Sequence, residues 1–323
     1  MRRPSGPPPR PPLSSASPVA PQPLARKVSS PDGLEPRAPK QLVTLDVPVQ
    51  PRSSDDVYLA GSGPGWVDPA PAQVDRAPPV ALYTGPLFKD GPSPADVQQG
   101  QLGDCYMCAA MAGLAATNPK AVRELIKPRP DGSADVTFYE RDVVSGQFHP
   151  VVIHVDAELY ESRGGEVLYG HAKGERGSME LWFPLVEKAY AQWKGGYETV
   201  GLGGVQNELF EAVLGRPAGW LAIGEQSDRE AVWGTIQATL QAGLPIGAAT
   251  QSFDDGRYAN TGVHANHGYS VLGTEQQGAE RFVVLRNPWG EGEPRGDGVD
   301  DGVFRLELED FVKLYGQLQF TLV

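Results

Sequence analysis

Cysteine is scarce in this chain, because its 323 residues include only Cys105 and Cys108. Two cysteines exclude the dense disulfide framework of small secreted domains. Long apolar runs are also missing, since no stretch approaches the roughly 18 apolar residues of a membrane-spanning helix. The opening run, MRRPSGPPPRPPLSS, lacks the apolar segment of a secretory signal. We therefore expect a protein without a membrane span, in a reducing, cytoplasmic setting.

Proline is distributed unevenly, and 19 of the 31 prolines fall within residues 1–80, where aromatic side chains are few. Such a composition cannot bury enough apolar surface to offset the entropy lost when a chain becomes ordered. Residues 1–80 are therefore expected to form a largely disordered N-terminal extension. We interpret it as a passive linker, and docking of proline-recognising partners through its PPPRPP run or a propeptide removed by self-cleavage are the alternatives.

Basic residues are outnumbered, and the formal net charge is −12. Residues 1–75 hold eight basic and seven acidic side chains, which leaves 20 basic and 33 acidic side chains for residues 76–323. The acidity therefore belongs to the part expected to fold. This balance argues against nucleic acid as a partner. It also leaves carboxylates available for hard cations such as calcium.

The apolar pattern predicts helices early in the folded part and strands late. Such segregation predicts an α+β protein of two subdomains with a cleft between them, and we place these at 81–200 and 201–323. Helical spacing or capping signals predict helices near 105–117, 121–126, 179–195, 205–215 and 227–243. Alternating or continuous apolar runs predict strands near 134–142, 146–156, 245–250, 267–276, 281–289, 302–308 and 318–323.

The run QQGQLGDCYMCAAMAGL places both cysteines where a glycine-rich turn becomes an alanine-rich helix. Cys105 follows the expected N-cap Asp104, where free N–H groups and the helix dipole lower a thiol pKa and make the thiolate nucleophilic. Cys108 lies one turn further and is expected in the core. A zinc site would need more soft ligands than the scattered histidines supply. A redox CxxC pair would be expected directly after a β-strand.

A cysteine nucleophile needs a base and a group that orients it. The strand-rich half offers both, in HANHGYSVLG and VVLRNPWGE. His267 opens an alternating strand, and Asn287 ends a second strand 20 residues later. Neighbouring strands would place the Asn287 carbonyl beside the His267 ring. His264 is a weaker candidate for the base, because the alternating strand begins at His267.

The blocks QGQLGDC, NHGYSVLG and LRNPWGE resemble, in order and separation, the catalytic blocks of the calpain-type, papain-like cysteine peptidases. ELWFPLVEKAYAQWKGGYE and DDGVFRLELEDFVKLY resemble further parts of that catalytic core. The resemblance implies a papain-like fold with a helical, Cys-bearing half and a β-rich half that bears His and Asn. It also implies that Cys105 is the nucleophile, His267 the general base and acid, and Asn287 the residue that orients the imidazole. Gln99 would complete the oxyanion hole.

The same resemblance implies that Trp289 shields the contact between histidine and asparagine, or acts as a wedge that keeps the cleft open without an activator. Cys108 stands where the family usually has an apolar residue. A conservative core substitution explains it, and an oxidative link to Cys105 is the alternative. Such a link would join residues three apart in a helix, which is poor disulfide geometry.

The family's catalytic core binds two calcium ions, and this chain has no EF-hand loop of the D-x-D-x-D-G form. For the first ion, Gly91, Asp96 and Glu180 stand at the matching positions, and Lys89 could add a carbonyl oxygen.

For the second ion, Glu293 and Asp301 match, whereas Val303 stands where the family has a carboxylate and the loop is shortened. Asp297 or Asp300 could compensate. We therefore expect calcium dependence through the first site, with the second altered.

The sequence thus predicts a calcium-dependent cysteine endopeptidase that cleaves proteins or peptides through a Cys-His-Asn triad and a thioester acyl-enzyme. In this scheme calcium gates the enzyme by closing the two subdomains. A non-catalytic regulatory domain on the same fold is one alternative. A transglutaminase-like acyl transferase is the other, although that chemistry usually uses an acidic third residue instead of Asn287.

Overall fold

The computed structural model describes residues 58–59, 68–174, 177–251, 256–294 and 298–322. Most of the predicted N-terminal extension, with its PPPRPP motif, lies outside these residues, as does Asp297. Within the described residues, no helix combines the length and apolar character needed to cross a bilayer. The α-helices are α1 (Cys105–Thr117), α2 (Pro119–Leu125), α3 (Trp182–Lys194), α4 (Tyr197–Val200), α5 (Gln206–Leu214), α6 (Arg229–Gln241) and α7 (Leu308–Leu314).

The strands form separate antiparallel sheets, of which the largest has six strands in the order β12-β11-β10-β9-β13-β8. A three-stranded sheet runs β4-β5-β6, and two small sheets pair β1 with β3 and β2 with β7. This mixture of helices and sheets confirms the predicted α+β class. The strands are β1 (Tyr58–Leu59), β2 (Val80–Leu82), β3 (Gly85–Pro86), β4 (Ile126–Pro128), β5 (Ala134–Arg141), β6 (Phe148–Val155), β7 (Glu158–Tyr160), β8 (Ala218–Ala222), β9 (Ile246–Thr250), β10 (Gly268–Gln277), β11 (Glu280–Arg286), β12 (Val303–Glu307) and β13 (Tyr315–Thr321).

Two buried apolar cores lie on either side of the link between α5 and β8. The first contains members from Ala72 to Val213 and the second contains members from Ile223 to Leu318. The first core therefore begins before the predicted boundary at residue 80 and extends past the one at residue 200. Ala72 belongs to it because its backbone N–H donates to the buried Tyr169 hydroxyl at 2.9 Å.

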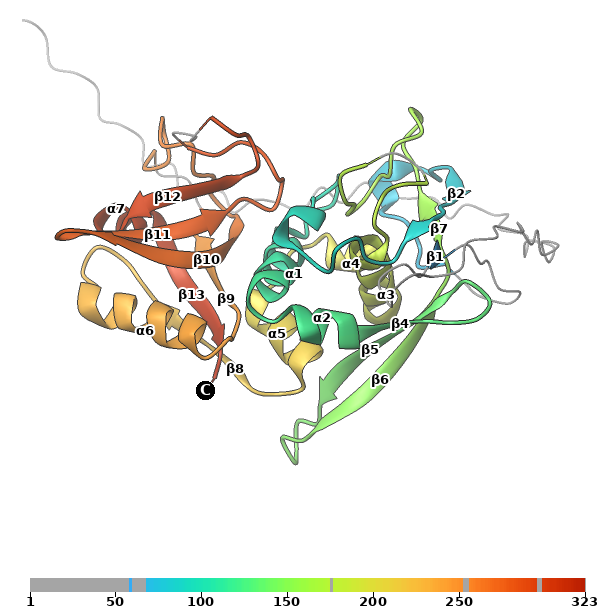
Figure 1. The fold of residues 1–323 in the computed structure, drawn as a ribbon, viewed down its shortest axis with the longest axis horizontal. Coiled ribbons are helices and arrows are strands. Elements are labelled where there is room, and N and C mark those ends of the chain that lie inside the picture. The colour runs from blue at the N-terminus through green and yellow to red at the C-terminus, as the bar shows by residue number, and fades with distance from the viewer. Residues whose placement is uncertain (1–57, 60–67, 175–176, 252–255, 295–297, 323) are drawn as a thin grey trace, which may run out of the picture. The chain divides into compact units, whose positions relative to one another are not determined.

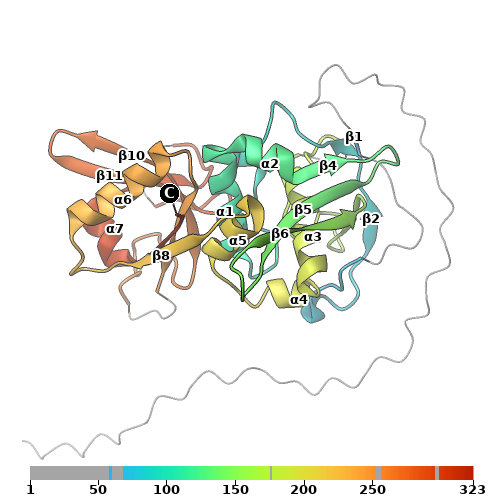
Figure 2. The same ribbon diagram turned by 90° about the horizontal axis from the view of Figure 1, so that it is seen from below.

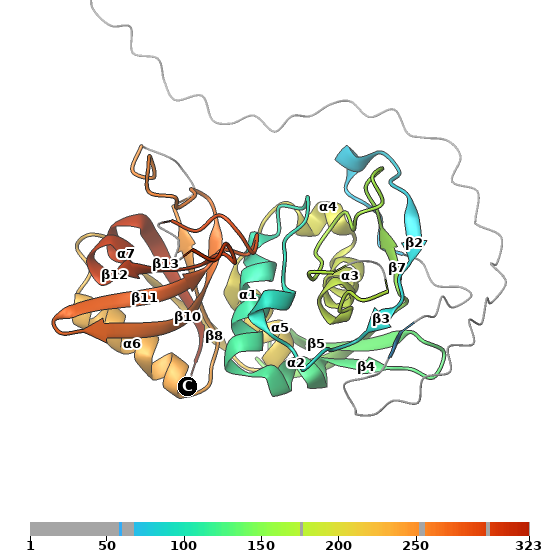
Figure 3. The same cartoon turned by 45° about the horizontal axis from the view of Figure 1, so that its top comes forward.

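The helix α1 is buried on almost every side, as its run of alanine, methionine and leucine requires. It packs against β10 and β9 on one side and against α5 on the other (Figure 1). Strand alternation divides the two faces of β10: Tyr269 and Val271 point into the second core, while Ser270 lies against α1. The helices α6 and α7 lie on the face of the second core (Figure 3).

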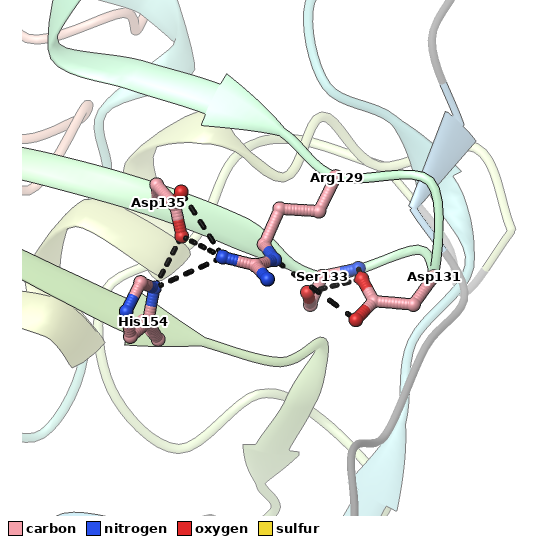
Figure 4. Close-up of polar contacts among 5 residues, drawn as sticks. All are labelled: Arg129, Asp131, Ser133, Asp135 and His154. Carbon is pink, nitrogen blue, oxygen red and sulfur yellow. Dashed lines mark hydrogen bonds and ion pairs between the residues drawn. The ribbon is translucent and has the colours of Figure 1, made fainter.

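The three-stranded sheet packs against α3 and α5 (Figure 2). The end of this sheet near the β4–β5 turn carries a polar network, in which Arg129 Nη1 donates to Asp135 Oδ1 at 3.0 Å and the His154 ring contacts the same carboxylate (Figure 4). Asp131 accepts the Ser133 N–H at 3.2 Å and closes the turn between β4 and β5. None of these residues is among the predicted site residues.

Two elements near the C-terminal end were not predicted from the sequence, the strand β8 and the helix α7. The buried residues of α7, at positions 308, 311 and 312, do have helical spacing. No element was predicted between the strands expected at 302–308 and 318–323. The half-exposed β8 has no periodic signal, because it pairs with β13 at the sheet edge and leaves Trp220 60% exposed.

Phe138 anchors the three-stranded sheet, since its ring stacks on Trp193 with 5.2 Å between centroids and meets Tyr190 edge to face. We expect Phe138→Ala to lower the free energy of unfolding by about 3–5 kcal/mol, as other buried aromatic truncations do. Val143 is 96% exposed in the turn of the same hairpin, so Val143→Ala should change the free energy of unfolding by less than about 0.5 kcal/mol. Urea unfolding followed by circular dichroism measures both, and equal effects would contradict the packing described.

Candidate active site

His267 and Asn287 meet at one end of the six-stranded sheet. His267 directly precedes β10, and Asn287 directly follows β11. These strands are antiparallel neighbours, with Ser270 opposite Arg286, so the start of one adjoins the end of the other. The His267 Nε2 and Asn287 Oδ1 atoms lie 2.9 Å apart. Both side chains are buried.

The Asn287 amide has one orientation that satisfies all its neighbours. Its Nδ2 donates to the Glu291 carbonyl at 3.0 Å, and its Oδ1 accepts the Trp289 N–H at 3.2 Å. Oδ1 is therefore the atom that faces His267, and an oxygen acceptor requires a proton on Nε2. This tautomer leaves His267 Nδ1 as the nitrogen that can accept a proton.

Cys105 is the first residue of α1, and the start of β10 packs against it. A Cβ atom on Gly268 would lie 3.4 Å from the Tyr106 Cα and 3.5 Å from the Cys105 carbonyl oxygen. One turn further along α1, the Ala109 carbonyl accepts the buried Ser270 hydroxyl at 2.7 Å. The thiol is thus held beside the residue that follows His267. Cys108 lies deeper, fully buried, with its Sγ 3.6 Å from Asp104 Oδ1.

Both reactive groups are neutral in this arrangement. Burial raises the pKa of the Cys105 thiol. The backbone N–H of Gly268 lowers this pKa, and the Asp104 charge raises it further. The effect is opposite to the lowering expected from the helix start. Burial also lowers the pKa of His267 to about 4, although its hydrogen bond to Asn287 opposes the shift. Desolvation disfavours the charged form of each group, so the pair is a thiol and an imidazole here.

Gln99 lies between the Asn287 turn and the start of α1. Its backbone N–H donates to the Pro288 carbonyl at 2.9 Å. Its side-chain Nε2 donates to the Leu102 carbonyl at 2.7 Å, and this bond uses one of the two amide hydrogens. Nearby, the buried Arg286 donates to the Val97 carbonyl at 2.7 Å. These bonds join the segment that carries Gln99 to the end of β11.

Asp104 occupies the N-cap position of α1 but its side chain forms no capping hydrogen bond. The prediction of Asp104 as the N-cap residue is confirmed, although its side chain does not cap the helix. The carboxylate is completely buried and turns toward Cys108. N-terminal amides of a helix have no intrahelical acceptor. The Cys105 N–H thus remains without a side-chain cap.

The Trp289 ring covers the outer side of the histidine. Its centroid lies 4.9 Å from that of His267 and 4.5 Å from that of His264. The indole is 38% exposed, so it separates the buried contact between His267 and Asn287 from solvent. His264 itself is partly exposed, and the bond to Asn287 comes from His267.

The carboxylates predicted for the first calcium site converge. Asp96 Oδ2 accepts the Ser93 N–H at 2.6 Å and the Trp182 indole N–H at 3.2 Å. Glu180 accepts the Lys89 N–H. Burial raises the pKa of Glu180 to about 8. The Lys89 N–H opposes this shift, and the neighbouring Asp96 adds to it. Two converging oxygen donors suit a hard cation such as calcium.

Gly91, the remaining candidate of this site, has a φ of +91° that favours glycine. A Cβ atom there would also lie 2.4 Å from the Arg123 guanidinium.

The second candidate calcium site is different, because its carboxylates bond to their own loop. Glu293 Oε2 accepts the Gly302 N–H at 2.8 Å, and Asp301 Oδ1 accepts the Val303 N–H at 2.9 Å. Asp300 accepts the Gly292 N–H at 2.7 Å. These bonds hold the loop in shape and give each carboxylate a backbone partner.

Thr250 at the end of β9 was missed by the sequence reasoning. Its hydroxyl accepts the His267 N–H at 2.9 Å and donates to the His264 carbonyl at 2.7 Å. It thus fixes the backbone that carries the imidazole. Ser270 was also missed, although a polar residue at an inward position of the predicted strand could have indicated a helix packed there.

Comparison with known proteins agrees with this geometry. The model of a family described as calpain family cysteine protease matches residues 71–301. The chain is 31% identical to the calpain-2 catalytic subunit of Gallus gallus over 278 residues, which is 75% of this chain and 37% of that protein. It is 29% identical to the calpain-1 catalytic subunit of Mus musculus over 276 residues, with the same shares.

A plant relative has a similar level of identity over a shorter stretch. The calpain-type cysteine protease DEK1 of Arabidopsis thaliana is 32% identical over 214 residues, which is 63% of this chain and 9% of that protein. The chain therefore spans well under half the length of these relatives. On the extent of the family match, together with the identity to the calpain subunits, the chain belongs to the calpain family of cysteine proteases.

Proposed function

We propose that this protein is a calcium-dependent cysteine endopeptidase that uses Cys105, His267 and Asn287 as its catalytic triad. One observation carries the proposal. His267 and Asn287 contact each other at 2.9 Å, and His267 immediately precedes the start of β10, which packs against the first residue of α1. A nucleophile, a base and a group that orients the base are the parts that acyl transfer requires. The match to a cysteine protease family supports the same chemistry.

In the proposed reaction, His267 Nδ1 takes the proton of the Cys105 thiol while the sulfur attacks the scissile carbonyl. The oxyanion that forms is stabilised by the Cys105 N–H and by the Gln99 side-chain amide. The imidazolium then gives its proton to the leaving amine, the C–N bond breaks and a thioester remains. Water, deprotonated by His267, releases the acid and restores the thiol. Asn287 keeps the proton-accepting nitrogen directed at the sulfur.

Calcium is the proposed cofactor, and Asp96, Glu180 and the Gly91 carbonyl would hold it in the first half. When bound, it would supply positive charge that holds these oxygen donors together. The convergence of Asp96 and Glu180 supports this part of the proposal. Because the Glu293 and Asp301 carboxylates bond to their own loop, we assign the calcium requirement to the first set. Proteins and peptides are the proposed substrates.

Purified protein incubated with casein should release peptides in the presence of calcium, and excess chelator should stop the release. Cys105→Ala should abolish it, because no other group can form the thioester. Peptide release is followed by fluorescence of labelled casein. Incorporation of a labelled amine without cleavage would support acyl transfer instead, and no reaction under any condition would support a non-catalytic domain.

Gln99→Ala should lower kcat by about 10²–10³, because it removes one oxyanion donor. The exposed neighbour Gln101 provides the control, and Gln101→Ala should keep kcat within about threefold. Initial rates on a fluorogenic peptide, measured across substrate concentrations, separate kcat from KM. Equal rates for the two variants would exclude Gln99 from the oxyanion hole.

Calcium should raise the melting temperature of the Cys105→Ala protein, which cannot digest itself. Glu180→Gln on that background should abolish most of the rise, because it removes a charged oxygen ligand. The exposed Glu166→Gln is the matched control and should respond as the parent does. Differential scanning fluorimetry across calcium concentrations gives the result. A full calcium response in the Glu180→Gln protein would place the site elsewhere.

A further inference from the structure

A second cluster of titratable groups lies directly beneath Cys105, and the proposed mechanism does not use it. Asp104, Cys108 and Glu187 each offer a ligand or proton-binding atom, and these atoms lie within 4.8 Å of one another. All three residues are buried to 1% exposure or less. In the described part of the chain this is the one such group of three. Buried carboxyl groups need partners, so the arrangement calls for an explanation.

Glu187, on α3, holds the segment that flanks Gln99. Both of its carboxyl oxygens lie 2.9 Å from the Gly170 backbone nitrogen. The Gly170 segment in turn pairs with the segment of Gln99: the His171 and Gln98 backbones exchange hydrogen bonds of 2.8 and 2.9 Å. A Cβ atom on Gly170 would lie 2.5 Å from Glu187 Oε1, so the contact requires glycine.

The pairing of the two segments continues past Gln99. The Gln101 N–H donates to the Leu168 carbonyl at 2.9 Å. A Cβ atom on Gly100 would come within 2.2 Å of the Tyr169 carbonyl oxygen, so the backbones touch at this point. Gln99 is therefore held on both sides by a segment whose own anchor is the Glu187 carboxyl.

Asp104 connects the same anchor to the nucleophile. It directly precedes Cys105, and its carbonyl accepts the N–H groups of Met107 and Cys108 at 2.8 and 3.1 Å. Its carboxylate turns inward, where the Cys108 thiol donates to Oδ1 at 3.6 Å and the Glu187 carboxyl lies within 4.8 Å. The buried pair of Asp104 and Glu187 thus connects to both donors of the proposed oxyanion hole. Glu187 reaches the segment of Gln99 through Gly170, and Asp104 directly precedes Cys105.

A single proton between Asp104 and Glu187 allows both carboxyl groups to be buried together. Burial raises the pKa of Asp104 to about 6 and raises that of Glu187 well above its usual range, with the Asp104 charge adding to the latter. Two carboxyl groups whose oxygens lie within 4.8 Å of each other cannot both be charged in a buried site. Glu187 is therefore the acid that donates, and Asp104 the carboxylate that accepts.

Other titratable groups also face this pair. Lys188, next to Glu187, is turned away and donates to Asp156. The facing groups are Cys105, Tyr106 and Cys108 on α1, Tyr197 on α4 and, beyond Cys108, Arg286 at the end of β11.

We propose that Asp104 and Glu187 form a proton-sharing carboxyl pair that positions Gln99 and the Cys105 N–H relative to each other as one oxyanion hole. The proposal rests on the function proposed above and adds two positioning residues to it. A carboxylic acid suits this place because it can accept from Gly170 and donate to Asp104 at once. An ionised Glu187 would lose the second bond and face another negative charge.

Variants of Glu187 test the positioning role. Glu187→Leu removes both bonds and should lower kcat on a fluorogenic peptide about 10–100-fold with little change in KM, since the loss falls on the transition state. Glu187→Gln, whose amide can still accept from Gly170 and donate to Asp104, should recover most of that loss. Val186→Ala, a buried truncation on the same helix, controls for lost packing and should keep kcat within about threefold.

The pH dependence of unfolding tests the shared proton without any need for activity. Because the fold raises the pKa of Glu187, its stabilising contribution is complete below the unfolded value near 4.3 and declines as pH rises toward the folded value. Glutamine does not titrate. On the Cys105→Ala background, the melting temperature of Glu187→Gln relative to its parent should therefore rise by about 3 °C or more between pH 5 and pH 9.

Each outcome decides one part of the proposal. If Glu187→Leu and Val186→Ala lower kcat equally, or if Glu187→Gln recovers nothing, the positioning role is wrong while the peptidase function stands. If wild-type protein cleaves nothing, the proposed function fails and the positioning role with it, and the unfolding measurement still tests the proton. A Glu187→Gln protein that is less stable than its parent at pH 9 would show that the fold favours a charged Glu187 there, and the shared proton would be wrong.

If Glu187→Leu does not fold, the pH profiles of kcat for Glu187→Gln and wild type still test the shared proton. A shared proton predicts that Glu187→Gln keeps its kcat at the alkaline end of the pH profile, where wild type loses activity as Glu187 ionises. Superimposable pH profiles would overturn the proposal.

Discussion

The close approach of α1 to the start of β10 is the contact on which the site depends. Gly268 has no side chain, so the strand can lie against the backbone of Cys105 and Tyr106. Ser270, the next residue on that face, donates its hydroxyl to the Ala109 carbonyl. Because His267 immediately precedes this strand, the contact brings the ends of two separately packed cores together. A Cβ atom at position 268 would meet this backbone at ordinary contact distance and the Gln206 amide at 2.9 Å, so a larger residue would first displace Gln206.

This proximity has an electrostatic consequence. The burial that orders Cys105 and His267 also disfavours their charged forms, and the pKa values move in the directions that keep both neutral. A thiolate and an imidazolium can form here only when their mutual attraction offsets the lost hydration. That attraction depends steeply on distance in a poorly solvated site. Small movements between α1 and β10 therefore act directly on the proposed nucleophile, which is a physical basis for gating by a cation bound elsewhere.

Sequence reasoning reached the elements and the order of the candidate site, because helix periodicity, strand alternation and the three motif blocks are local signals. It did not reach the direction of the Asp104 side chain, which turns inward toward Cys108 and toward the Glu187 carboxyl 83 residues away on α3. Glu187 does lie on the apolar face of its helix, between Phe183 and Tyr190, so periodicity could have indicated a buried acid. Its partners Gly170 and Asp104 are set by tertiary packing, and no local pattern contains them.

The chemistry of Asn287 shows why an amide, and no acid, fits the third position. Its oxygen accepts from both His267 and the Trp289 backbone, while its nitrogen donates to the Glu291 carbonyl. An aspartate would place a second oxygen against that carbonyl and bury a charge without a cation beside it. It would also favour the imidazolium and oppose the neutral base that burial produces here. The site thus uses hydrogen-bond direction, with no added charge, to orient the histidine, and this distinguishes it from acyl transferases that rely on an acidic third residue.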